Sequence, residues 1–182
     1  MAVCAGDGVE RWDVIDALGR LVAKSMVGVE HHRGSARYQL LETLRHFARD
    51  RTDAGGTIEG LRPGHAAYYA GLAEQAGPAL MSPAELDWRP RVILELDNFR
   101  VATPWAFDAA HVDDMAFGVR ILDGLMTEAL LMPSSGVATR AEPALGRVDD
   151  LDPTRRGVVL AAAACHSWLI GDIGRGESLA TR

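Results

Sequence analysis

The sequence predicts a mainly α-helical protein with one β-hairpin near its N-terminus. Most segments repeat apolar residues every three or four positions, which is the spacing of a helix with one buried face. Residues 26–40 depart from this spacing and contain two short β-prone runs around a Gly-containing turn. The 182 residues are rich in alanine and only 6% aromatic, a composition that suits closely packed helices better than a β-sandwich.

The first predicted elements are a helix and a hairpin. Residues 12–25 have helical periodicity, with an apolar stripe formed by Val14, Leu18 and Leu21. Residues 26–30 and 37–40 are short strands, and residues 31–36 contain the Gly and Ser of a turn between them. A helix that leads directly into a hairpin is the way in which a winged-helix module ends.

A second helix is predicted over residues 41–51. Its apolar stripe is formed by Leu41, Leu44, Phe47 and Ala48. The segment Asp53-Ala54-Gly55-Gly56 is the best candidate for a linker, because paired glycines end helices. We therefore expect residues 1–54 to form a partial winged-helix module, which consists of a helix, a β-hairpin and a helix.

The remaining residues, 55–182, read as a helical-repeat segment similar to tetratricopeptide repeats. Helices are expected over residues 65–76, 92–108, 113–131, 139–148 and 153–170. Breaks are expected at Pro78, Ser82-Pro83 and Pro133–Gly136. Successive helices with short breaks indicate antiparallel hairpins packed as an array, although no clean 34-residue repeat is present. Pro104 lies inside the helix expected over residues 92–108, where a proline costs about 3 kcal/mol unless the helix kinks.

Charge and composition disfavour several classes of function. The net charge is −6, and neither the segment up to Gly60 nor the remainder has the basic excess that neutralises nucleic acid phosphates. No apolar run reaches the roughly 20 residues that cross a bilayer, and the N-terminus does not have the pattern of a signal peptide. Cys4 and Cys165 fit no metal-binding spacing. We expect a cytoplasmic protein with two reduced thiols that contacts neither membrane nor nucleic acid directly.

No catalytic, nucleotide-binding or metal-binding residues are predicted, and no cofactor is expected. His31-His32 lies at the predicted hairpin tip without the three or four converging ligands of a metal site, and Asp149–Asp152 lacks the glycine and distal glutamate of a calcium loop. The only candidate contacts with a partner are Arg45 and Arg49, on the polar face of the second helix.

Two long runs carry a resemblance to a known family. Asp13–Val27 and Ala36–Arg49 resemble the patterns DVLxxLxxLVxKSLV and RYRLLETxRxYA, which occur in the winged-helix segment of bacterial STAND-type ATPase regulators. This is the LuxR/AfsR-like group, which includes adenylate-cyclase-linked regulators. His65–Tyr69 and Leu94–Arg100 are similar to the HAxYY and ExDNLR stretches that open the family's helical repeats. The resemblance covers residues 12–105.

The resemblance implies a regulatory role next to an ATPase domain. In such proteins a nucleotide-binding core precedes the winged helix, which packs on it, and the repeats that follow sense ligands or partner proteins. ATPase activity is not implied for this chain, because it lacks the phosphate-binding loop and its only lysine, Lys24, lies in a predicted helix. The family's winged helix also begins upstream of Ala2, and Pro104 interrupts a helix that is usually continuous.

Three hypotheses about function follow. The first is a non-catalytic regulatory and protein-interaction module, whose partner is another protein or a nucleotide-binding ATPase domain. The second is a winged-helix transcription factor that binds DNA, which the acidic Asp13 and Asp16 on the candidate recognition helix disfavour. The third is a truncated remnant without independent function, because the winged helix is incomplete and residues 174–182 resemble part of a repeat helix.

Overall fold

The computed structural model describes residues 3–4, 8–32, 35–54, 57–108 and 112–182. The chain divides into two compact units, Met1–Gly64 and His65–Arg182. The division falls within one long helix, α3 (Thr57–Leu80). The assignment of residues 1–54 to a winged-helix module and of 55–182 to helical repeats stays a prediction.

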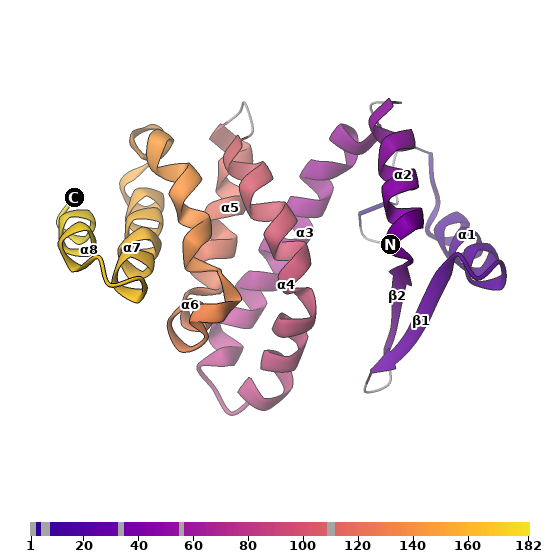
Figure 1. The fold of residues 1–182 in the computed structure, drawn as a ribbon, viewed down its shortest axis with the longest axis horizontal. Helices are drawn as coiled ribbons and strands as arrows, with labels where there is room; N and C mark the ends of the chain where they lie inside the picture. Colours follow the sequence, from indigo (N-terminus) through magenta and orange to yellow (C-terminus); the bar gives the residue numbers. More distant parts are fainter. Residues whose placement is uncertain (1–2, 5–7, 33–34, 55–56, 109–111) are drawn as a thin grey trace. The chain divides into compact units, whose positions relative to one another are not determined.

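The first unit has the predicted order of helix, hairpin and helix (Figure 1). It contains α1 (Arg11–Ala23), β1 (Val27–His32), β2 (Ser35–Leu40), α2 (Glu42–Ala54) and the start of α3. The strands pair antiparallel from Val27 opposite Leu40 to His32 opposite Ser35. They are therefore longer than predicted, and the centre of the predicted turn, residues 33–34, lies outside the described residues.

The end of α1 explains how the chain enters the hairpin. The predicted helix continues to Ser25, but α1 ends at Ala23, and Ser25 adopts the left-handed conformation with φ 56°. The Ser25 amide donates to Val22 O at 2.9 Å and the Met26 amide donates to Leu21 O at 2.9 Å. These two bonds satisfy carbonyls that a helix end leaves unpaired, and they turn the chain into β1.

The second unit is an array of helices, so the mainly α-helical prediction is confirmed. After α3 the chain forms α4 (Glu85–Asp108), α5 (Val112–Gly124), α6 (Met126–Leu131), the 3-10 helices η1 (Pro133–Ser135) and η2 (Ala138–Asp150), α7 (Pro153–Leu169) and α8 (Ile173–Ala180). Figure 1 shows these helices following one another along the array. In it α4 contacts α5 and η2, while α7 contacts α5, η2 and α8.

One apolar core runs through this unit. The small side chains of α3 are buried in it, and the larger ones that fill it include Phe99, Phe107, Met115, Ile121, Leu122 and Leu125. Tyr69 and Phe99 meet edge to face, with ring centroids 5.3 Å apart. The Tyr69 hydroxyl donates to Glu95 Oε2 at 2.9 Å, so its polar end is satisfied at the margin of the core.

Pro78 does not have the predicted effect, and α4 contains two further prolines. Helix α3 includes Pro78, so the break expected there is wrong, whereas Ser82 and Pro83 do lie in the turn between α3 and α4. Helix α4 continues through both Pro90 and Pro104. Residues on either side of Pro104 are buried in the core, and this packing offsets the amide hydrogen bond that proline cannot make.

The single helix predicted over residues 113–131 is two helices. Leu125 leaves the helical region at φ −106° and ψ 12°, and α6 begins after it. Just before it, a β-carbon at Gly124 would lie only 2.3 Å from Ala73 O, so α3 and α5 approach closely there. The predicted helix over 139–148 is also of a different kind, because η2 is a 3-10 helix that includes Pro143.

Candidate interaction surface

The first unit exposes many of its large apolar side chains. Trp12 on α1 is 76% exposed and Phe47 on α2 is 61% exposed, although Phe47 belongs to a predicted buried stripe. The other exposed large apolar residues of this unit are Val9, Ile15, Met26, Tyr38, Leu40, Leu41 and Leu61. Among the residues of this unit that the structure describes, only Val27 is a buried core side chain. We call Trp12, Phe47 and these seven residues the exposed apolar set.

Such exposure is unusual for helices with amphipathic periodicity. Apolar residues at helical spacing normally face a core, because removing apolar area from water stabilises by roughly 25 cal/mol per Å². Here no residue of α1 is fully buried, and the stripe residues Val14, Leu18 and Leu21 are half-buried. Exposed apolar residues that gather into one patch mark an interaction surface, whereas single ones are common on folded proteins.

The predicted partner contacts Arg45 and Arg49 both lie exposed on α2. The Arg45 guanidinium is engaged by Glu42, to which Arg45 Nε donates at 3.1 Å. The Arg45 hydrogen bond is the main reason that the pKa of Glu42 is lowered, with smaller effects of its charge and of His46, and slight burial acts in the opposite direction. The guanidinium of Arg49 makes no bond to the part of the chain that the structure describes.

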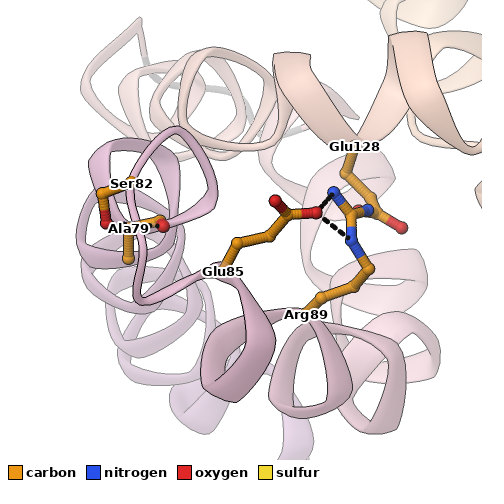
Figure 2. Close-up of polar contacts among 5 residues, drawn as sticks. All are labelled: Ala79, Ser82, Glu85, Arg89 and Glu128. Atoms are coloured by element: carbon orange, nitrogen blue, oxygen red, sulfur yellow. Dashed lines mark hydrogen bonds and ion pairs between the residues drawn. The ribbon is translucent and has the colours of Figure 1, made fainter.

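A buried ion pair in the second unit is the main feature that sequence reasoning missed. Glu128 on α6 is fully buried, and its Oε2 accepts a hydrogen bond from Arg89 Nη1 of α4 at 2.5 Å. Arg89 also donates to Glu85 Oε1 through Nε at 3.0 Å and Nη2 at 2.8 Å. Figure 2 shows the Arg89 guanidinium between the two carboxylates.

The environment of Glu128 favours its protonated form. Burial raises the pKa of Glu128, the charge of Arg89 lowers it, and the charge of Glu85 raises it further. The second carboxylate oxygen, Oε1, is buried without a hydrogen-bond partner among the described residues. A buried, partly satisfied ion pair contributes little net stability but is costly to break, because the remaining charge is left unpaired.

The turn beside this pair positions Glu85 at the start of α4 (Figure 2). The Ser82 hydroxyl donates to Ala79 O at 3.0 Å and accepts from the Ala84 amide at 3.2 Å. The Glu85 amide in turn donates to Ser82 O at 3.0 Å. Ser82 therefore holds the turn between α3 and α4 in place. Glu85, the first residue of α4 after this turn, accepts hydrogen bonds from Arg89.

Two more ion pairs join helices that are distant in the sequence. Arg120 on α5 donates to both carboxylate oxygens of Glu74 on α3, at 2.6 and 2.8 Å, and this contact lowers the pKa of Glu74. Arg175 on α8 donates to Glu142 on η2 at 2.6 Å. A single sequence offers no signal for such pairs, because their members lie dozens of residues apart.

The described residues contain no group of three or more His, Cys, Asp or Glu side chains that could hold a metal ion. Both cysteines are free thiols: Cys4 is exposed and Cys165 is buried, and burial raises the pKa of Cys165. Within the same residues, no helix is long and apolar enough to cross a bilayer.

Comparison with known proteins points to bacterial regulators. The chain is similar to proteins of Mycobacterium bovis and of two strains of Mycobacterium tuberculosis, each named "Putative HTH-type transcriptional regulator". Each is 34% identical to this chain over 116 residues, which is 62% of this chain. The chain spans only 13% of the length of these curated relatives. No protein-family model and no solved structure matches it.

Proposed function

We propose that the chain is a non-catalytic regulatory module of a bacterial transcriptional regulator, which acts by binding another protein domain. The observation that carries this proposal is the exposed apolar set of the first unit. Trp12 and Phe47 belong to helices whose periodicity calls for a buried face, yet both side chains are exposed. The similarity to much longer proteins named as HTH-type regulators supports a regulatory setting.

The partner that we propose is the nucleotide-binding domain of a STAND-type regulator. The resemblance of residues 12–105 to such regulators supports it, since their winged helix packs on that domain. Arg49 would lie at the margin of the contact, where an exposed guanidinium could meet an acidic side chain at little cost in desolvation.

Binding to purified fragments of the Mycobacterium tuberculosis relative tests the proposal. The fragments would cover the parts outside the 116 matched residues, and isothermal titration calorimetry would measure binding to the full chain. The double substitution Trp12→Ser and Phe47→Ser should weaken binding about tenfold or more, because each removes a large apolar contact. Leu86→Ser is the matched control, since Leu86 is 81% exposed but lies on α4 in the second unit.

Two results would count against the proposed contact. One is that no fragment binds the unmodified chain. The other is that Leu86→Ser weakens binding as much as the double substitution, which would mean that the first unit has no special part in it.

DNA binding is a second candidate, because the names of the curated relatives refer to a helix-turn-helix. The charges on α1 give it little support, since Arg20 is paired with Asp16 at 2.9 Å and Asp13 caps the helix through the Glu10 amide. A fluorescence-anisotropy titration with duplex DNA at low salt separates the two candidates. Strong binding that weakens steeply with added salt would favour the DNA-binding function.

A further inference from the structure

Two arginines of the second unit converge on one turn. Arg100 of α4 points its Nη2 at Ser135 O, 3.4 Å away. Gly136 follows in the left-handed conformation at φ 69°, and a β-carbon built on it would lie 3.6 Å from Arg140 Nη2 of η2. The two guanidinium groups therefore lie against adjoining residues, although their arginines are 40 positions apart in the sequence.

Among the described residues, the two positive charges of this pair have one carboxylate beside them. Arg100 Nη1 donates to Asp97 Oδ1 at 2.7 Å, and Asp97 is 85% exposed. Arg140 is half-buried and makes no side-chain hydrogen bond or ion pair to the residues that the structure describes. Burial and the neighbouring charge of Arg100 lower the pKa of Arg140, and Asp97 only partly opposes them.

Most other arginines of this unit are placed differently from Arg140. Carboxylate partners lie within 3.3 Å of Arg89, Arg120, Arg147, Arg155 and Arg175, as one does for Arg100. The exposed Arg91 instead stacks over the ring of Trp88, 4.3 Å from its centroid. Arg140 thus combines partial burial, a like-charged neighbour and, among the described residues, no carboxylate at ion-pair distance. Each of these destabilises a lone cation, and a bound anion would relieve all three.

We propose that Arg100 and Arg140, whose guanidinium groups lie beside the turn at Ser135–Gly136, bind a small oxyanion, either a phosphate or a carboxylate group. A guanidinium presents planar donors that match the oxygens of both groups and bind them in a bidentate manner. The contact of Arg100 with Ser135 O is long, so its Nη2 retains capacity to donate to a ligand. The site lies in the second unit and does not depend on the docking proposed for the first.

Nuclear magnetic resonance of the full chain tests this site. The Nε–Hε signals of Arg100 and Arg140 would be assigned with the variants Arg100→Lys and Arg140→Lys. Sodium phosphate and sodium succinate would be titrated separately, against sodium chloride at equal ionic strength. We expect saturable shifts of both signals with at least one of the two anions, and the anion that binds identifies the group as a phosphate or a carboxylate.

Matched variants separate specific binding from general screening. Arg140→Gln should weaken binding about tenfold or more, because charge-assisted hydrogen bonds are lost. Arg91→Gln also removes one positive charge, in this case from α4, and should leave the affinity for the anion unchanged. Arg140→Lys keeps the charge without the planar fork and should bind with intermediate affinity, which also shows that loss of binding is not loss of fold. Shifts that are linear, equal for all arginines or absent with both anions would overturn the proposal.

Discussion

Arg89 Nη1 lies 2.5 Å from Glu128 Oε2 and joins α4 to a carboxylate that is completely buried on α6. The two residues are 39 positions apart. The pair connects a helix of the core to the short helix that follows the interruption at Leu125. Substitutions of Arg89 and of Glu128 therefore test different parts of the stability of this pair.

Removing Arg89 should destabilise the protein strongly. Arg89→Ala leaves Glu128 buried and unpaired, and breaking such a pair costs about 3–5 kcal/mol. We expect the lower end of this range, because Glu128 can take up a proton instead of remaining charged. Urea unfolding measures the loss, with Arg91→Ala on the same helix as the control. A loss no larger than that of the control would mean that the pair is not formed in solution.

Glu128 should also make stability depend on pH. Because burial raises its pKa in the folded chain, the folded state holds this proton more tightly than the unfolded state. The resulting stabilisation is present below the unfolded pKa of about 4.3 and is lost as the pH rises through the folded pKa.

The variant Glu128→Gln isolates this effect, since it shares every other titrating group with the unmodified protein. Urea unfolding would be measured at a series of pH values. As the pH rises from the unfolded pKa of Glu128 through its raised folded pKa, the unmodified chain should lose stability relative to the variant. A difference between the two that stays constant with pH would contradict the raised pKa.

The close approach of α3 and α5 should make Gly124 intolerant of substitution. In Gly124→Ala the new β-carbon would lie 2.3 Å from Ala73 O and 2.4 Å from Ala73 C, and these backbone atoms cannot move aside alone. We expect a loss of about 1–3 kcal/mol in the free energy of unfolding, or more. Gly71→Ala is the control, because nothing lies within 4 Å of its β-carbon on α3, and it should be neutral or stabilising. Equal effects of the two substitutions would show that α3 and α5 are further apart in solution than in this structure.

The exposed apolar set should contribute little to the stability of the isolated chain. Trp12→Ser and Phe47→Ser are expected to change the free energy of unfolding by no more than about 0.5 kcal/mol each. Phe99→Ala, at a core position that is 1% exposed, should cost about 3–5 kcal/mol. Thermal and urea unfolding provide the comparison. A large loss at Trp12 would show that its ring is packed in solution and would weaken the case for a docking surface.

The sequence predicted the fold where local patterns decide it. Helix α7 begins at the predicted Pro153, and the Asp152 side chain before it accepts from the amides of Thr154 and Arg155. The hairpin follows from alternation around a glycine-containing turn. Capping, periodicity and turn chemistry act within a few residues, so they can be read from one sequence.

The close approach at Gly124, the arginine pair and the exposure of Phe47 depend on contacts between residues that are distant in the sequence. Glycine is common at helix ends, but the close approach of Gly124 to Ala73 on another helix is not visible in one sequence. The convergence of Arg100 and Arg140 likewise depends on how α4 packs against η2. Periodicity predicted a buried face for α2 but could not say that the Phe47 side chain on that face is exposed in the described chain.

The contact at Gly124 has a consequence for how this region can diverge. A β-carbon at Gly77 would lie 3.0 Å from Gly124 O, so two glycines on neighbouring helices share one narrow crossing. In diverging copies of this region, we expect glycine to persist at position 124 even where the surrounding apolar residues are exchanged freely. Copies that lose this glycine should show compensating changes on α3. The pattern of substitution at this crossing would then distinguish lineages that keep the helical packing from lineages that have rebuilt it.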